Sequence, residues 1–462
     1  MEQKNDRELR WMRLDNAALI FPAAQRRHWS NAFRIAFTFS DPVDPDMLQR
    51  ALGRIAPRFP SVVVRLRRGV FWHYLEELKD PPAVQADTWQ PLRSMTGADV
   101  RRCAIRVLYY RDRMAVEFFH AVTDGTGGMV FAKSLAAEYV RERYGVAVAC
   151  TDGVKDPDEP PREEEFVDSF QENAGPLAAP RDDRNVYRAK GETEPDRFLH
   201  VTTGVVDAAQ LLREAKARGV TVTAYLTALL LQSLLQMQAE DEPRRRKRSP
   251  VKVQVPVNLR RLYGGDTMRN FVAVANIGVD PRLGDYTFEE LVQSVHHQMS
   301  LAITEKNMRA IFTPNVNDEQ NKFMKIVPLG LKNLVMRLVF DAIGERVASL
   351  ALSNLGNVRL PEAMAPYVRR VEFVLGAQAT APYNCSVTSW QGRTYINIVR
   401  NSLEPRLERA FFHRAGKAGL PCKNREQRQI RSYPCTVSNA AWSCRRASKS
   451  ARCAVCAFTI RS

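Results

Sequence analysis

The chain has 462 residues, of which 45% are hydrophobic and 26% charged, a composition typical of a soluble protein with a sizeable core and two or three units of domain size. The net charge of +17 could indicate nucleic acid or an anionic membrane as a partner, but its distribution argues against both, because nine Lys or Arg and one Glu at 423–462 account for +8 of it. No signal peptide and no transmembrane segment are visible, so we expect a cytoplasmic protein.

Apolar alternation and turn residues in the first 150 residues predict a mixed α/β layer. The runs typical of strands alternate with period two, and those typical of helices repeat every three or four residues. We expect strands at 32–39, 61–66, 70–74, 100–110 and 114–121, and helices at 44–52 and 129–139.

The stretch M-A-V-E-F-F-H-A-V-T-D-G-T-G-G, at 114–128, holds the clearest candidate for chemistry. His120 lies where the predicted strand ends, so rigid backbone would hold its imidazole at the edge of a cavity. A neutral imidazole is the side chain best suited to take a proton near neutral pH. Asp124 can turn back under the histidine or anchor the turn, and Gly125 and the glycines after it allow a tight bend and positive φ. A buried histidine followed by an ordinary Asp-Gly turn is the alternative interpretation.

The middle and second half of the chain differ in composition. Residues 151–197 are acidic and poor in aliphatic side chains, so we expect a linker or surface crossover that buries little. In V-K-V-Q-V-P-V-N-L-R, at 251–260, valines at every second position predict a strand. The apolar window 326–343 is interrupted by Pro328 and charged residues, which indicates a buried or amphipathic helix. Other strands are expected at 198–206, 271–279 and 347–352, with 371–375 and 394–399 closing the second half, and helices at 208–217, 223–237 and 407–412.

Ser353-Asn354-Leu355-Gly356 follows the strand predicted at 347–352. A hydroxyl, an amide and backbone N–H groups at a bend can stabilise a developing oxyanion, so Ser353 and Asn354 are candidate site residues. A plain turn after a strand is the alternative interpretation.

The motif H-A-V-T-D-G at 120–125 resembles the H-x-x-x-D-G signature of thioester-dependent acyltransferases with the chloramphenicol acetyltransferase-like fold. This superfamily includes plant acyl-CoA transferases, condensation domains of peptide synthetases, wax ester synthases and alcohol acetyltransferases, and the chain looks most like the bacterial alcohol acetyltransferase-like branch. The resemblance covers about residues 10–422 and depends on the order and spacing of several short motifs. These are L-D-N-A-A at 14–18, R-F-P at 58–60, R-R-G-V-F-W at 67–72, V-P-V-N-L-R at 255–260 and L-S-N-L-G at 352–356.

The resemblance implies an α/β protein of mixed sheets, with two chloramphenicol acetyltransferase-like lobes and the active-site channel at their junction. It places the N-terminal lobe at 1–150, an acidic linker or crossover at 151–197 and the C-terminal lobe at 198–422. It also implies that the segment equivalent to Ser353 and Asn354 borders the channel.

The resemblance further assigns a role to Arg260, which would form a salt bridge with Asp124 across the two halves. The physical reason is that an unpaired buried carboxylate is costly, and an arginine can hold it while fixing the turn that carries His120. Arg261 is the second candidate for this role, and a surface arginine at a strand end is the alternative interpretation.

The predicted function is therefore the transfer of an acyl group from a thioester, acyl-CoA, to an alcohol or amine, with His120 as the general base. The moderately basic body suits a substrate with phosphates, and no covalent acyl-enzyme or tightly bound cofactor is required. An acyl or peptidyl carrier protein is the rival donor, but condensation domains usually carry two adjacent histidines and here Phe119 precedes His120. A non-catalytic member that serves as a binding module is the other alternative.

No metal site is expected. Cys453 and Cys456 have the spacing of a zinc knuckle, but a second pair with matching spacing is missing. His296 and His297 are adjacent, so on a helix they point in different directions.

The end of the chain departs from the family pattern. Relatives usually finish with a segment similar to V-K-I-E-S-N, whereas P-C-K-N-R-E-Q stands here at 421–427. One extra adenine in the coding stretch AAA ATC GAG AGC AAC changes its translation from K-I-E-S-N to K-N-R-E-Q. We therefore expect residues 423–462 to be a disordered or frameshifted tail, and resequencing the gene tests the frameshift.

Overall fold

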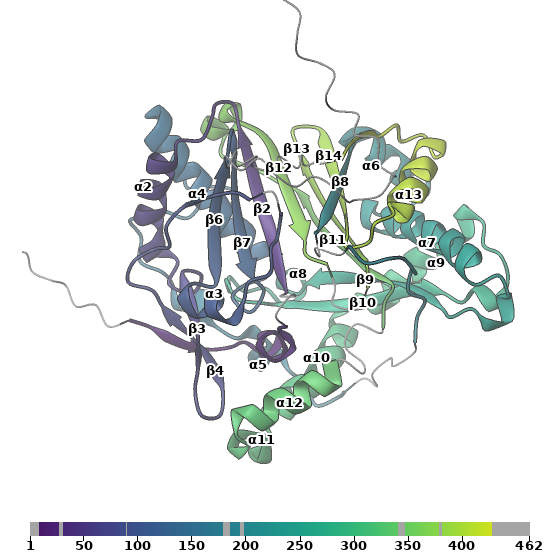
Figure 1. Cartoon of the computed structure of the whole chain (residues 1–462), viewed down its shortest axis with the longest axis horizontal. Coiled ribbons are helices and arrows are strands. Elements are labelled where there is room, and N and C mark those ends of the chain that lie inside the picture. The colour runs from purple at the N-terminus through teal and green to yellow at the C-terminus, as the bar shows by residue number, and fades with distance from the viewer. Residues whose placement is uncertain are drawn as a thin grey trace, which may run out of the picture. The chain divides into compact units, whose positions relative to one another are not determined.

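The computed structural model describes residues 9–26, 31–88, 90–178, 185–194, 198–340, 347–377 and 381–426, with the side chains of all but 323–324 and 423–426. Most of the expected tail, including Cys453 and Cys456, lies outside these residues. The structure has mixed α/β architecture, as predicted, with three sheets and helices packed around them (Figure 1).

A five-stranded sheet in the order β12-β2-β7-β6-β5 carries His120 at the end of β7. Its strands are β12 (Val368–Leu375), β2 (Ala32–Phe39), β7 (Arg113–Phe119), β6 (Ile105–Tyr110) and β5 (Gln85–Ala86). The alternation at 32–39 predicted β2 correctly. Helices α2 (Pro45–Ile55) and α4 (Gly125–Tyr144) pack against each other, and α4 lies against β2 and β7 (Figure 1).

The predicted strand at 100–110 is wrong in its first part. Thr96 and Asp99 form a capping box, in which each side chain accepts the backbone N–H of the other, and this starts helix α3 (Gly97–Arg102). Next to this segment, β1 (Trp11–Arg13), β4 (His73–Glu77) and β3 (Val64–Arg68) form a small antiparallel sheet. The strands predicted at 61–66 and 70–74 are therefore present as the antiparallel pair β3 and β4, but they begin three residues later, and the turn between them is at 69–72.

A seven-stranded sheet in the order β10-β9-β11-β13-β14-β8-β15 makes up the other large sheet. Its strands are β10 (Val272–Val279), β9 (Val251–Asn258), β11 (Leu350–Asn357), β13 (Tyr383–Trp390), β14 (Arg393–Arg400), β8 (His200–Asp207) and β15 (Lys423–Glu426). The central strand β13 was not predicted. The first four residues of the expected tail form β15, which pairs antiparallel with β8.

Strand β12 joins the two large sheets. The prediction that 371–375 closes the second half is wrong, because β12 pairs antiparallel with β2 and so extends the first sheet. Side chains of β13 reach across to it: Ser386 Oγ donates to the Phe373 carbonyl at 2.7 Å, and Thr388 Oγ1 to that of Val371 at 3.1 Å. These bonds explain why a strand rich in Ser and Thr is buried. The lobe boundaries at 1–150 and 198–422 stay a prediction.

The crossover is more firmly anchored than its composition suggested. Glu165 and Phe170 are both 2% exposed, so the expectation that 151–197 buries little is wrong at these positions. Arg58, itself 1% exposed, holds Glu165 with two hydrogen bonds of 2.6 and 2.8 Å. A bidentate Arg–carboxylate pair satisfies both buried charges, and it fixes this segment to the first half of the chain.

Further helices complete the fold. In the second half they are α6 (Ala208–Ala217), α7 (Val222–Asp241), α8 (Arg260–Tyr263), α9 (Phe288–Ala302), α10 (Glu305–Gln320), α11 (Lys322–Ile326), α12 (Leu329–Val339) and α13 (Arg406–Lys417). The short helices α1 (Ile20–Ala24) and α5 (Ser169–Asn173) come earlier in the chain. Within the described ranges, none of the helices alone has the length and apolarity to cross a membrane, and α6 and α7 reach them only together, across a bend of 83°.

Candidate active site

His120 is the residue immediately after β7, and its side chain lies among aromatic rings. Its backbone N–H donates to the Asn31 carbonyl at 2.9 Å, which continues the pairing between β7 and β2 by one bond. The imidazole packs against Phe21 of α1, with ring centroids 4.8 Å apart, and against Phe33 of β2, at 5.2 Å. The residue as a whole is half-buried, and these two contacts hold the ring between aromatic side chains.

One polar contact selects the tautomer of the neutral ring. Its Nδ1 lies 3.0 Å from Oδ1 of Asn270, in the loop before β10. The amide of Asn270 donates in two other directions, to Asp15 Oδ2 at 3.0 Å and to the His120 carbonyl at 3.1 Å, so its oxygen must face the ring. Because an amide oxygen can only accept, Nδ1 carries the proton and the neutral ring has its lone pair on Nε2.

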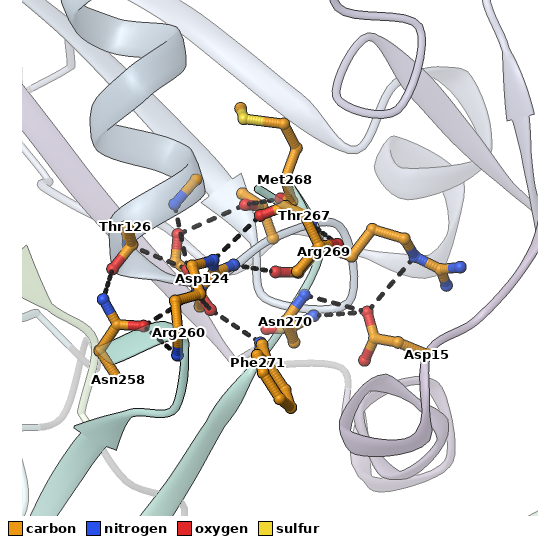
Figure 2. Close-up of polar contacts among 12 residues, drawn as sticks. Asp15, Asp124, Thr126, Asn258, Arg260, Thr267, Met268, Arg269, Asn270 and Phe271 are labelled. Carbon is orange, nitrogen blue, oxygen red and sulfur yellow. Dashed lines mark hydrogen bonds and ion pairs between the residues drawn. The ribbon is translucent and has the colours of Figure 1, made fainter. Parts of the chain in front are cut away.

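Asp15 supports Asn270 from the other side. It is fully buried and accepts from the backbone and side chain of Asn270 and from the Ala18 N–H, while the Arg269 guanidinium lies 3.7 Å away (Figure 2). Burial raises the pKa of Asp15, and the nearby guanidinium and N–H donors act in the opposite direction. The chain Asp15–Asn270–His120 thus links the N-terminal segment to the imidazole through a buried network.

Asp124 holds the turn after His120 and does not contact the imidazole. Its Oδ1 caps α4 by accepting the N–H groups of Thr126 and Gly127, both at 3.0 Å. Its Oδ2 accepts from Arg260 Nη1 and from the Phe271 N–H, both at 2.8 Å (Figure 2). Of the two roles considered for Asp124, the structure therefore shows the anchoring of the turn.

Arg260 and Asp124 are brought together as a buried ion pair, with side chains 9% and 1% exposed. The same guanidinium donates to Asn258 Oδ1 at 3.2 Å and to the backbone carbonyls of Thr267 and Arg269 (Figure 2). Arg260 therefore connects the start of α4 to the loop that carries Asn270. Arg261, the second candidate, is exposed.

The glycines of the motif serve close packing rather than positive φ. Among the glycines with positive φ in the described residues, none belongs to this motif. A Cβ on Gly125 would lie 2.9 Å from Leu355 Cδ2, and one on Gly127 would lie 2.4 Å from the Met268 carbonyl oxygen. The sequence-based reason for these glycines is thus corrected: the backbone of α4 begins in direct contact with two other segments.

Ser353 and Asn354 lie within a strand and not after one. β11 continues through Asn357, and both residues are half-buried there. The Asn354 amide donates to Thr223 Oγ1 at 3.1 Å and its carbonyl accepts the Gly356 N–H at 2.8 Å. This segment lies next to the motif because Leu355 packs against Gly125. Among the described residues, neither Ser353 nor Asn354 forms a hydrogen bond with His120.

A cavity of about 330 Å³ lies next to the network that holds His120. Arg269 and Leu14, the sequence neighbours of Asn270 and Asp15, line it together with Asp168 and Glu319, whereas His120 does not. Burial, reinforced by the nearby charge of Asp15, raises the pKa of Asp168 to about 7. Burial likewise raises the pKa of Glu319.

The raised pKa of Asp168 predicts a specific pH dependence of stability. Because the folded state holds this proton more tightly, the stabilisation is fully present below the unfolded pKa of 3.8 and is lost as the pH rises through about 7. Melting temperatures measured from pH 4 to 8 should therefore decline over this window, and Asp168→Asn should flatten the decline. A variant whose decline is as steep as that of the wild type would show that Asp168 is not the group that titrates.

The sequence did not indicate Asn270, and it gave Asp15 no role. Asp15 stood in the L-D-N-A-A motif only as part of the resemblance. Asn270 forms its contact with His120 across 150 residues, so no local pattern points to it. The only local signal for Asn270 was the sequence M-R-N-F at 268–271, next to the strand predicted at 271–279. An ordinary polar loop can have the same sequence.

No family model matches the chain, and no curated protein matches it. Solved structures do match over most of its length. Polyketide synthase associated protein 5 from Mycobacterium tuberculosis is 13% identical, with a TM-score of 0.57 over 88% of this chain and 96% of that one.

Two further structures match equally well. TRI101 of F. sporotrichioides, complexed with coenzyme A and T-2, is 12% identical, with a TM-score of 0.58 over 90% of this chain and 99% of that one. The first condensation domain of the calcium-dependent antibiotic synthetase, in complex with a substrate analogue, is 16% identical, with a TM-score of 0.56 over 88% and 95%. At such identities the likeness establishes the fold, and it confirms the predicted fold class. The chain has the mixed α/β fold of coenzyme A-bound TRI101 and of this condensation domain.

Proposed function

We propose that this protein is an acyltransferase that moves an acyl group from a thioester, acyl-CoA, to the hydroxyl or amine of a small acceptor, with His120 as the general base. The observation that carries the proposal is the contact between Asn270 Oδ1 and His120 Nδ1, which leaves Nε2 unprotonated. An imidazole held in one tautomer at a strand end, with its second nitrogen not engaged by Asn270, has the properties that general base catalysis requires.

The proposed reaction needs one base and no covalent intermediate with the protein. His120 Nε2 takes the proton of the acceptor O–H or N–H while the acceptor oxygen or nitrogen attacks the thioester carbonyl. The tetrahedral intermediate collapses with cleavage of the C–S bond, and the leaving thiolate receives the proton from the imidazolium. Ester or amide and free thiol are the products, and the imidazole is again neutral.

Donors for the tetrahedral oxyanion are proposed at Ser353 and Asn354. Support comes from the packing of Leu355 on Gly125, which places this part of β11 beside the turn that follows His120. Asn354 already uses its amide carbonyl and donates one of its two N–H groups, so a second N–H is available for an oxyanion.

Coenzyme A is the proposed carrier of the acyl group. TRI101, whose fold this chain shares, was solved with coenzyme A bound. The likeness to condensation domains supports a carrier protein as the second candidate donor. Phe119, which stands where such domains usually have another histidine, is fully buried and supplies no second imidazole.

Activity assays that combine each of several acyl donors with several acceptors test the proposal. The purified chain is incubated with acetyl-CoA, a long-chain acyl-CoA and acyl-loaded carrier protein, each with a panel of alcohols and amines. We expect free thiol and acylated acceptor in equal amounts with at least one CoA donor. Turnover with loaded carrier protein alone would favour the condensation-type alternative, and no thioester consumption with any donor would favour a non-catalytic binding module.

Asn270 is expected to act as a positioning residue. Asn270→Ala frees the ring to adopt the other tautomer, so we expect kcat to fall by about 10- to 100-fold, the usual cost of losing a group that orients an imidazole. KM should change little because Asn270 contacts the ring and not the substrate. Asn276→Ala, on the following strand, is the matched control. Equal kcat values for the two variants would contradict the role of Asn270.

A further inference from the structure

Helix α12 is amphipathic, but its apolar side faces solvent. Its exposed face carries aliphatic side chains at positions spaced by three or four residues, and they are 42–60% exposed: Leu331, Leu334, Val335, Leu338 and Val339. A surface helix of a globular protein normally turns such a stripe towards the core.

Two polar side chains of α12, Lys332 and Asn333, face the protein instead, whereas Arg337 is exposed. Lys332 is 2% exposed, its Nζ donates to the Phe71 carbonyl at 3.0 Å, and it lies 3.4 Å from the centre of the Trp72 ring. Asn333 Nδ2 lies 3.2 Å from His73 Nε2. These contacts of Lys332 and Asn333 hold α12 in the orientation that exposes its leucines.

The turn between β3 and β4 extends the same surface. The Leu329 N–H donates to the Val70 carbonyl at 2.9 Å, which joins the start of α12 to this turn (Figure 1). Val70 is 73% and Phe71 42% exposed, and Ile326, just before α12, is 68% exposed. We call these three residues and the five of the α12 stripe the apolar face. Exposed apolar side chains gathered on adjoining segments mark an interaction site more strongly than single exposed leucines do.

The two segments that carry the apolar face are basic in sequence. Residues 321–340 contain four Lys or Arg and no Asp or Glu, and residues 67–74 contain two Arg and no acidic residue. Lys322, Lys325 and Arg337 are exposed. An aliphatic stripe on a projecting helix, flanked by long cationic side chains, matches the interface of an anionic bilayer, where the stripe enters the acyl boundary and the cations meet the headgroups.

We propose that the apolar face binds the surface of membranes that contain anionic phospholipids. The aliphatic character of the face favours lipid over a protein partner, because protein interfaces concentrate their binding energy in Trp, Tyr and Arg. This proposal does not depend on the acyl transfer proposed above, since it rests on α12 and the β3–β4 turn alone.

Sedimentation with vesicles tests the proposal on the full chain. Wild-type protein is mixed with vesicles of phosphatidylcholine and phosphatidylglycerol, or of phosphatidylcholine alone. We expect binding to the anionic vesicles, and a fall in the partition coefficient of about tenfold or more for Leu334→Ser/Leu338→Ser, because two anchoring leucines are lost. Leu283→Ser/Leu301→Ser replaces two leucines that are 82% and 72% exposed elsewhere and should bind like wild type.

The paired variants also separate the proposal from simple charge attraction. Lys322→Gln/Arg337→Gln should reduce the preference for anionic over neutral vesicles. Equal binding of the two leucine variants, or no wild-type binding to anionic vesicles, would overturn the proposal. So would a dimer in sedimentation velocity that Leu334→Ser/Leu338→Ser dissociates without an effect on vesicle binding, because the face would then join two copies of the chain.

Discussion

Replacing His120 by alanine lowers kcat for acyl transfer by about 10²–10⁴-fold, the contribution that a positioned general base typically makes. The effect falls on kcat because the imidazole acts on the acceptor proton, while the groups that bind the thioester are untouched. The melting temperature should change little, since His120 is half-buried and its ring contacts are with side chains that pack elsewhere as well. Steady-state kinetics with the donor and acceptor that react fastest in the assays above measure kcat for the wild type and for His120→Ala.

His296→Ala is the control for this prediction. His296 is also half-buried, on helix α9, and has no contact with the motif. It should keep wild-type kinetics. Near-normal turnover in His120→Ala would remove His120 from the mechanism, even if the protein proves to be an acyltransferase.

Replacing Asp124 by asparagine lowers the free energy of unfolding by about 3–5 kcal/mol, the usual cost of breaking a buried ion pair from one side. Each carboxylate oxygen of Asp124 accepts from two N–H donors. In either orientation an asparagine amide would point its NH₂ group at one of these donor pairs and leave the Arg260 charge poorly compensated. Denaturant unfolding of the wild type and the variant measures the difference.

Arg260→Gln should lose stability to a comparable degree, because it removes the other half of the pair. Arg261→Gln is the matched control: the neighbouring arginine is exposed, and its replacement should leave stability within about 0.5 kcal/mol of wild type. Full stability and full activity in Asp124→Asn would show that the ion pair does not hold the turn.

The parts of the fold that the sequence predicted best are those whose signals are local. Alternation gave β2 with its observed bounds, and the helix expected at 44–52 is observed as α2, which begins at Pro45 and ends three residues later than expected. The helix at 97–102 was missed although Thr96 and Asp99 carried a capping signal. Strand β13 was missed for a physical reason: its buried Ser and Thr are satisfied by carbonyls of β12, a partner that no local pattern reveals.

The residues of the candidate site also differ in whether a local sequence signal predicts them. The motif itself predicted where His120 and Asp124 lie, and the resemblance supplied Arg260, which the structure places against Asp124. Asn270 and Asp15, which fix the tautomer, could not be found, because each acts through a contact with a residue far away in sequence. The stripe on α12 was visible as an amphipathic pattern, but only its packing shows which side faces outwards.

The tautomer of His120 is the most direct test of the account, and nitrogen NMR of protein labelled with ¹⁵N-histidine measures it. His120→Ala identifies the signals of this residue among the seven histidines. We expect a proton on Nδ1 and an unprotonated Nε2 at pH 8, with loss of this preference in Asn270→Ala. A proton on Nε2 of the neutral ring in the wild-type protein would contradict the proposed mechanism, because the remaining lone pair would then be on Nδ1, which faces Asn270.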